Sequence, residues 1–338
     1  MKKTNTFLII ALLLFCGSMA YFQAAKAWGF WAHARINRLA VFTLPPEMIG
    51  FYKQHIEFLT EHAVDPDKRR YASDDEAPRH YIDVDHYGKY PFEMMPRKWN
   101  DAVEKYTEDT LQAYGIAPWN MEVVLKRLTK AFEDCDKKRI LRYSADMGHY
   151  VGDGHVPLHT TKNYNGQLTN QKGIHGFWES RLPELYGENY DYWVGKAKYI
   201  ANPNEYIWNF ILESHIALDT VLLGEARLTE KFPSDQKYSY ETRGQTTTKT
   251  YSEEFSKAYD NILGDMVERR MKKAIISVGS FWTTAWINAG QPDLECLNEE
   301  VDLADIDREE KERLEKAKTG GKQKGRKHDN EGSDLSID

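Results

Sequence analysis

The stretch His149-Tyr150-Val151-Gly152-Asp153-Gly154-His155-Val156-Pro157-Leu158-His159 is the part of the chain around which the rest is organised. His149 and Asp153 stand four residues apart, a spacing that places two side chains one turn apart on the same face of an α-helix. Val156-Pro157-Leu158 ends that helix, because proline cannot continue it and restricts the residue before it. His159 can then turn back toward the same cavity, so the stretch predicts a metal site.

A second pair with the same spacing follows in Ile174-His175-Gly176-Phe177-Trp178-Glu179. Imidazole nitrogens and carboxylate oxygens without a thiolate suit a catalytic zinc site better than a structural one. The alternative is that both pairs are solvated side chains on helix surfaces. One such pair alone is ordinary, but two pairs and His159 within one short span favour the metal site.

The composition and the first residues indicate a folded, exported protein. The chain has 338 residues, of which 41% are hydrophobic and 13% aromatic, enough for a sizeable core. Residues 1–27 have the features of a signal peptide: a basic start, an apolar run from Phe7 to Phe15, and the small-residue end Ala25-Lys26-Ala27. That run is too short to span a bilayer. We expect cleavage before Trp28, delivery to the periplasm or the medium, and no stable membrane insertion.

Charge and cysteine content limit the partners and the covalent links. The formal net charge of −7 argues against binding long nucleic acid by charge alone, so phosphate recognition should be local and metal-assisted. Export would leave Cys135 and Cys296 either as one disulfide or as two free thiols. No obligate protein partner is evident in the sequence.

Apolar residues recur at helical spacing through most of the chain, and we find no stretch with the alternation of an antiparallel sheet. The helical patterns cover residues 33–44, 46–63, 99–114, 121–132, 138–153, 178–186, 204–232 and 252–289, with a polar loop beginning at Asp65-Pro66-Asp67-Lys68-Arg69-Arg70. The sequence therefore predicts an all-α fold: a single helical bundle domain over residues 28–300, with long loops around a zinc cluster. Residues 301–338 are charged and nearly free of large apolar residues, which predicts a disordered tail, with a short frayed helix at its start as the alternative.

The expected mature chain begins Trp28-Gly29-Phe30-Trp31-Ala32-His33. A free α-amine and the carbonyl of the same residue can chelate a metal, with His33 as a nearby third donor. The alternative, which these residues alone favour, is an ordinary terminus with a buried tryptophan and a histidine on a helix face.

Taken together, these donors resemble the ligand set of the three-zinc phosphoesterases. That superfamily joins the single-strand nucleases of the S-one/P-one type with the bacterial zinc-dependent phospholipases C. The resemblance spans Trp28 to about Gly290 and consists of nine residues of the right type in the right order: Trp28, His33, Asp65, His80, His149, Asp153, His159, His175 and Glu179.

The resemblance implies three Zn²⁺ ions and a hydrolytic reaction. One zinc would be held by Asp65, His80, His149 and Asp153. A second would be held by Trp28, His33 and the bridging Asp153, and a third by His159, His175 and Glu179. The implied reaction is hydrolysis of a phosphate ester by in-line attack of a zinc-activated hydroxide, with the third zinc stabilising the departing oxygen.

The resemblance also assigns roles near the metals. Lys68 stands three residues after Asp65, where the nucleases carry an arginine that touches phosphate, so Lys68 becomes a candidate charge clamp. Asp65 can also receive a proton from the attacking water. Tyr81 and Asp83 match a nuclease pattern in which an aromatic ring stacks on a base and a carboxylate reads its edge. The alternatives are a solvated lysine, a tyrosine packed beneath the cluster and an aspartate that caps a turn.

Two classes of phosphodiester substrate fit this pattern. The short step from Trp28 to His33 and the run His80-Tyr81-Ile82-Asp83 are similar to the nucleases, so our first expectation is a single-strand nuclease with 3′-nucleotidase activity. Glu179, where those nucleases usually carry aspartate, and the compact loop before His175 are more similar to the phospholipases C, which act on phospholipid head groups. A third alternative is a non-enzymatic zinc-binding protein of the cell envelope.

Overall fold

The computed structural model describes residues 29–70, 72–73, 75–89, 92, 95–243, 246–297 and 303–317. The predicted all-α fold is confirmed, because helices make up 72% of the structure and strands 4%. The predicted signal peptide and Trp28 lie outside the described residues.

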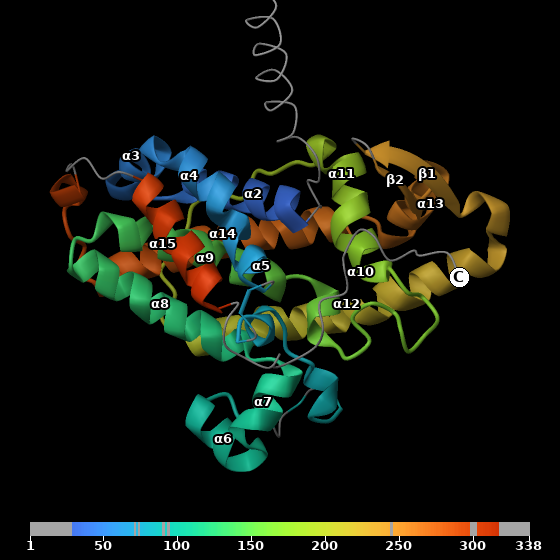
Figure 1. The fold of residues 1–338 in the computed structure, drawn as a ribbon, viewed down its shortest axis with the longest axis horizontal. Helices are drawn as coiled ribbons and strands as arrows, with labels where there is room; N and C mark the ends of the chain where they lie inside the picture. The colour runs from blue at the N-terminus through green and yellow to red at the C-terminus, as the bar shows by residue number, and fades with distance from the viewer. Residues whose placement is uncertain are drawn as a thin grey trace, which may run out of the picture.

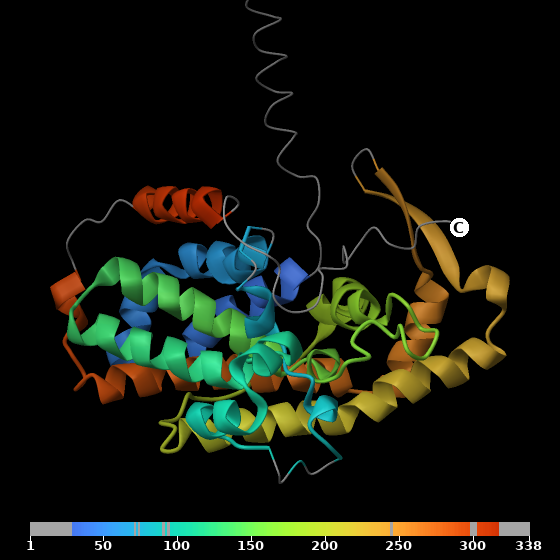
Figure 2. The same ribbon diagram turned by 60° about the horizontal axis from the view of Figure 1, so that its bottom comes forward.

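Among the described residues, five helices form the body of the fold, and their arrangement can be followed in Figures 1 and 2. Four of them pack against one another: α2 (Gly29–Ala40), α8 (Ala117–Glu133), α9 (Lys137–Gly154) and α14 (Met266–Asn288). The fifth, α12 (Pro203–Lys231), packs against α8 and α9 and against the short helix η6 (Pro157–Thr160). Their apolar faces share one large core.

Further helices surround this body. They are α3 (Pro46–Gln54), α4 (Ile56–Glu61), α5 (Asp65–Arg70), α6 (Trp99–Tyr106), α7 (Glu108–Tyr114), α10 (Ile174–Gly176), α11 (Leu182–Tyr186), α13 (Glu253–Leu263) and α15 (Ala304–Ala317). Single turns lie between them: η2 (Val41–Thr43), η3 (His62–Val64), η4 (Ala77–His80), η5 (Val84–His86), η7 (Phe177–Arg181), η8 (Gly187–Asn189), η9 (Ser234–Gln236) and η10 (Leu294–Leu297).

Local sequence signals start the longest helices. The side chains of Asp136, Asn202 and Ser252 each accept a hydrogen bond from a backbone N–H in the first turn of α9, α12 and α13. Such capping satisfies donors that have no partner inside the helix. Gly264, with φ of +63°, separates α13 from α14 where the sequence predicts one continuous helix.

A β-hairpin is one part of the fold that the sequence analysis misses. Strands β1 (Tyr238–Arg243) and β2 (Thr246–Tyr251) pair antiparallel, with Tyr238 opposite Tyr251, in a stretch expected to be a Ser/Thr-rich connection. Threonine and tyrosine favour strands. The ring of Tyr251 stacks on Phe177 with 3.8 Å between ring centroids, so the hairpin is tied to the helices.

The charged segment expected to be disordered also contains regular structure. Residues 304–317 form helix α15, in which Ile306 and Glu310 are buried. The helix contacts the bundle through Glu310, which pairs with two arginines, a contact that composition cannot reveal. Residues 318–338 lie outside the described part of the chain.

Two general expectations can be compared with the structure. Cys135 is disulfide-bonded, so it is not a free thiol; the side chains of Cys16 and Cys296 lie outside the described residues. Among the described residues, no helix combines the length and apolar character needed to cross a membrane.

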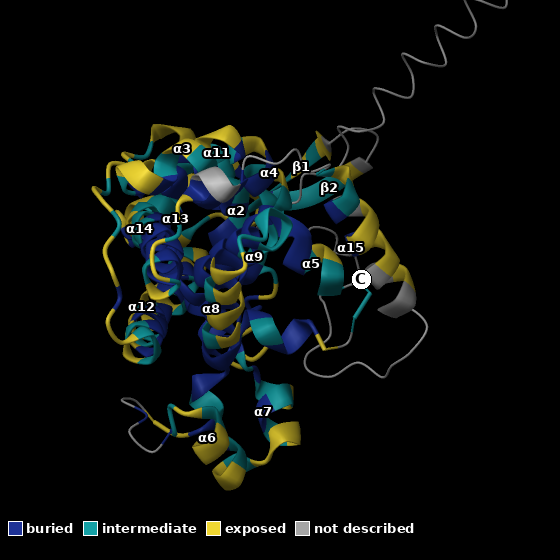
Figure 3. Cartoon of the chain, turned by 90° about the vertical axis from the view of Figure 1, so that its left-hand side faces the viewer, coloured by how far each residue is buried: buried dark blue, intermediate teal, exposed yellow. Residues whose placement is uncertain are grey.

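Helix α9 is buried along its whole second half. Every residue from Ser144 to His155 is buried (Figure 3). Two glycines on one face of this helix allow α2 to pack closely against it. A Cβ at Gly148 would collide with Asn37, and one at Gly152 would lie 2.9 Å from His33 Nδ1. Close packing of these two helices therefore depends on the absence of side chains at both positions.

We predict that Gly148→Ala lowers the free energy of unfolding by about 1–3 kcal/mol, because the added methyl group overpacks a fully buried contact. It would also displace Asn37, whose Nδ2 donates to the carbonyl oxygens of Leu59 and Ala145. Gly50→Ala is the control, because a Cβ there meets nothing within 4 Å and alanine favours the helix by up to about 1 kcal/mol. Urea denaturation of both variants measures the difference. Equal stability of the two variants would refute the packing argument.

Candidate metal centre

Four donor atoms from three elements converge beside α9. His80 Nδ1 of η4 lies 3.0 Å from His149 Nε2 and 2.9 Å from Asp153 Oδ2, and His149 Nε2 lies 3.3 Å from that same oxygen. Asp67 Oδ1 of α5 lies 3.7 Å from the His80 nitrogen and 3.6 Å from the His149 nitrogen. Zinc bonds of about 2.0–2.2 Å at tetrahedral angles place neighbouring donors about 3.3–3.6 Å apart. The separations from His149 to both carboxylates match this spacing, whereas His80 Nδ1 lies a few tenths of an ångström too close to His149 and Asp153, so a bound zinc would need the His80 ring to move back slightly.

The aspartate in this group is Asp67, whereas the sequence analysis assigned the ligand role to Asp65. Asp65 accepts a hydrogen bond from Lys68 Nζ at 2.7 Å and lies 2.6 Å from His62 Nδ1. It belongs to none of the candidate metal groups found among the described residues. Residues two apart on a helix point in different directions, and this segment is a helix, α5, where a polar loop was expected. Only one of the two carboxylates can therefore face α9.

The spacing to the next arginine is the signal that could have identified Asp67. Arg70 follows Asp67 by three residues, as Lys68 follows Asp65. Its Nη1 lies 3.8 Å from Asp67 Oδ1, and its side chain is 9% exposed. The nuclease pattern of an aspartate followed three residues later by an arginine is thus matched by Asp67 and Arg70 without the lysine substitution.

Asp153 lies between two groups of donors. Its Oδ2 faces His80 and His149, while its Oδ1 lies 3.3 Å from His33 Nε2. The His33 ring stacks on His149 with 4.0 Å between centroids, and His33, Asp67 and His149 form a further group of potential ligands. Asp153 therefore lies between the two groups, and its role as a bridging ligand stays a prediction. Trp28, the remaining expected ligand there, lies outside the described residues.

His159, His175 and Glu179 form a separate group, as the sequence predicts. Glu179 Oε2 lies 3.3 Å from His159 Nε2 and 3.1 Å from His175 Nε2. All three residues are buried. Residues 177–181 form a π-helical turn, a rare distortion that often marks functional sites. Three protein donors leave a position for water or substrate on a bound zinc.

Backbone carbonyls orient two of these imidazoles. His149 Nδ1 donates to the carbonyl oxygen of Ala63 at 2.8 Å, and His159 Nδ1 donates to that of His80 at 2.6 Å. A carbonyl oxygen can only accept, so the hydrogen lies on Nδ1 and, in the neutral ring, the Nε2 lone pair faces the other donors. Contacts of this kind fix the tautomer of metal-binding histidines.

The charges of the two clusters depend on one another. Burial would raise the pKa of Asp153, but His149 and His159 hold it well below its ordinary value. Burial would likewise raise the pKa of Glu179, but His175 and His159 hold that pKa below its ordinary value. Conversely, burial would lower the pKa of His149 and His159, but the facing carboxylates raise each to about 9. A metal ion must displace these imidazole protons as it binds, so its affinity should rise with pH.

The predicted substrate-binding residues lie in the interior. Tyr81 is 2% exposed, with its hydroxyl donating to the Ala113 carbonyl oxygen at 3.3 Å, and Asp83 is 5% exposed. Tyr81 is therefore packed in the interior, as in the alternative interpretation, and its ring is not available for stacking on a base. The Lys68 side chain is 48% exposed and paired with Asp65.

His155, which lies between Asp153 and His159 in the sequence, is a core residue that stacks on Phe210.

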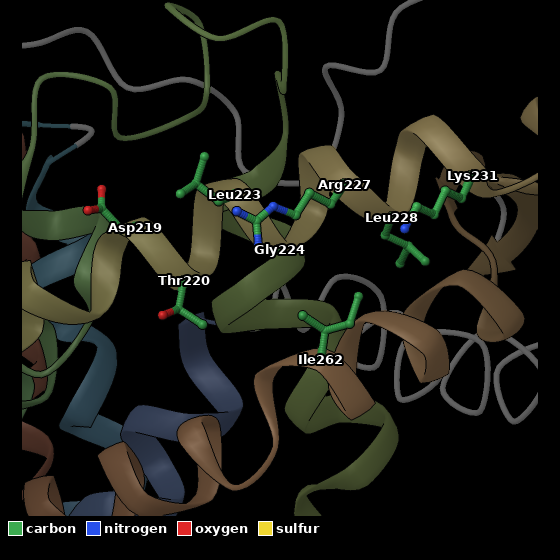
Figure 4. A pocket seen from close by; sticks show the side chains of 8 residues that line it. All are labelled: Asp219, Thr220, Leu223, Gly224, Arg227, Leu228, Lys231 and Ile262. Atoms are coloured by element: carbon green, nitrogen blue, oxygen red, sulfur yellow. The ribbon is translucent and has the colours of Figure 1, made fainter.

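A separate groove lies between α12 and α13 (Figure 4). It is lined by Asp219, Thr220, Leu223, Gly224, Arg227, Leu228, Lys231 and Ile262. None of the predicted site residues is among them, so the groove is distinct from the candidate metal centre.

Comparison with known proteins gives no family assignment. No protein-family model matches the chain, and no curated protein matches it. The likeness to the three-zinc phosphoesterases therefore stays a prediction that depends on the ligand pattern in the sequence.

We predict that Asp67→Asn lowers zinc affinity by at least about 100-fold, because it removes a ligand charge from the four-donor group; loss of an outer partner alone costs about 10–100-fold. Asp65→Asn is the matched control, two residues away on the same helix, and should lower zinc affinity less than about tenfold. Competition with a zinc-binding dye measures both affinities. A greater loss in the Asp65 variant would restore the original ligand assignment.

Proposed function

We propose that this protein is an exported zinc-dependent hydrolase of phosphate ester bonds, with single-strand nuclease and 3′-nucleotidase activity as the first candidate. The observation that carries the proposal is the convergence of donor atoms from Asp67, His80, His149 and Asp153, with 2.9–3.7 Å between neighbouring donors. Carboxylates and imidazoles without thiolates are the donors of catalytic zinc sites.

When bound, zinc would supply Lewis acidity, which lowers the pKa of water and polarises a phosphoryl oxygen. The ligands proposed here are Asp67, His80, His149 and Asp153 for one ion, His33 with the shared Asp153 and the predicted Trp28 for a second, and His159, His175 and Glu179 for a third. Two of these sets share Asp153, and the other is joined to them by the hydrogen bond from His159 to the His80 carbonyl.

Arg70 supports a phosphate ester as the substrate. Its guanidinium lies next to the Asp67 oxygen that faces the histidines. A planar guanidinium can hold two phosphate oxygens at once, which a lysine ammonium cannot do. We therefore assign to Arg70 the charge clamp that the sequence analysis assigned to Lys68. Asp65, already paired with His62 and Lys68, is poorly placed for the proton-accepting role.

Phospholipase C activity is the second candidate. Two observations favour it: Glu179 takes the place that nucleases usually give to aspartate, and the burial of Tyr81 removes the expected base-stacking ring. A non-enzymatic zinc-binding protein of the envelope would have the same ligands and no turnover.

The three candidates predict different results with purified protein that has been stripped of metal and then loaded with zinc. We expect zinc-dependent cleavage of single-stranded DNA, RNA and 3′-nucleotides, and slower cleavage of phosphatidylcholine. The opposite preference would identify the phospholipase. Full zinc loading with no cleavage of these substrates or of a generic phosphodiester would identify the non-enzymatic protein.

We predict that Arg70→Ala lowers kcat/KM for the preferred phosphate ester by about 100-fold or more, since removal of one positioned donor to a reacting group typically costs that much. Zinc content should stay unchanged. Lys68→Ala is the control and should lower kcat/KM less than about threefold, because Lys68 points to Asp65. A larger loss of kcat/KM in the Lys68 variant than in the Arg70 variant would assign the phosphate-binding role to Lys68.

A further inference from the structure

A buried network of charged side chains adjoins the candidate metal centre. Its middle is the guanidinium of Arg69, which lies 2.9 Å from Asp146 Oδ1, 3.2 Å from Glu310 Oε1 and 3.6 Å from Glu76 Oε1. The Arg69 side chain is only 11% exposed. The network therefore joins α5, α9, α15 and the segment before η4.

One of these groups, Glu76, lies close to a proposed zinc ligand, and Arg69 is near one in the sequence. Arg69 follows Asp67 by two residues on the six-residue helix α5. Glu76 Oε1 lies 3.7 Å from His80 Nε2, the ring nitrogen on the opposite side from the other donors, so the carboxylate acts on this ring by charge and not through a hydrogen bond. The hydroxyl of Tyr150, the residue after His149, donates to Glu76. A carboxylate behind a metal-binding histidine fixes its ring and strengthens it as a ligand.

Helix α15 supplies one of the three carboxylates in the network. Glu310 contacts Arg69 through Oε1 and Arg142 Nη2 through Oε2 at 2.8 Å, and it is 9% exposed. With Glu310 present, the carboxylates of Glu76, Asp146 and Glu310 face the guanidiniums of Arg69, Arg79 and Arg142. Without it, two carboxylates would face three guanidiniums, and an uncompensated buried positive charge is costly.

We propose that Glu310 is a positioning residue of the metal centre. Through this side chain, α15 contributes to cation binding. Glu310 holds Arg69 in place, Arg69 holds Glu76, and Glu76 orients His80. Loss of Glu310 would loosen this chain of contacts and leave excess positive charge beside the cation site. Both effects weaken cation binding. The inference rests on the proposed zinc site but goes beyond it, since it concerns a helix that supplies no ligand.

Zinc affinity of the full-length, metal-stripped protein tests the proposal. Glu310→Gln should lower it by about tenfold, the lower end of the effect of losing an outer-shell partner. Asp305→Asn is the matched control on the same helix: it breaks the 2.8 Å ion pair of Asp305 with Lys138, which fastens α15 without touching Arg69. The control should change zinc affinity less than about twofold.

Two further measurements separate positioning from a general loss of structure. The absorption spectrum of the cobalt-substituted protein should change in Glu310→Gln and stay unchanged in Asp305→Asn. Glu310→Asp, which keeps the charge, should recover most of the lost affinity, and it carries the test if Glu310→Gln does not fold.

Three results would overturn the proposal. Equal losses of zinc affinity in Glu310→Gln and Asp305→Asn would show that α15 affects zinc affinity only through its docking on the bundle. Unchanged affinity and an unchanged cobalt spectrum in Glu310→Gln would remove the positioning role while leaving the zinc site intact. Failure of the unmodified protein to bind zinc would remove the proposed function and this inference together.

Discussion

Mutual pairing of buried carboxylates and imidazoles is the interaction on which the rest of the structure depends. His80, His149 and Asp153 are each 2% exposed or less, and ionised groups at such burial are costly unless they are paired. Each carboxylate oxygen of Asp153 faces at least one imidazole nitrogen, and backbone carbonyls hold the far sides of His149 and His159. A cation between these groups would offset the remaining cost, which explains why a polar stretch can run through the centre of α9.

The bundle is shaped so that this stretch can be buried. Glycines at two positions of α9 let α2 approach until His33 stacks on His149. Helix α5 and η4 lie across α9 and bring Asp67 and His80 to its ligand face, while η6 returns the chain after Pro157 so that His159 lies beside Glu179. The ion network around Arg69 then fastens α5, η4 and α15 to the same helix.

The sequence predicts the parts of this arrangement that are local. Apolar periodicity identifies the long helices, and the four-residue spacing in α9 and in α10 with η7 places each histidine beside its carboxylate. Contacts between distant segments are beyond such reasoning. Asp65 and Asp67 differ in the sequence only by the lysine or arginine that follows three residues later, and the direction of α5 decides which of them faces His149. The burial of Tyr81 and the docking of α15 through Glu310 likewise depend on neighbours far away in the chain.

X-ray diffraction from crystals of the zinc-loaded protein, recorded on both sides of the zinc absorption edge, tests the central claim most directly. The account predicts an anomalous peak within bonding distance of Asp67, His80, His149 and Asp153, and another beside His159, His175 and Glu179. Zinc bound elsewhere, with these side chains still paired only to one another, would contradict it.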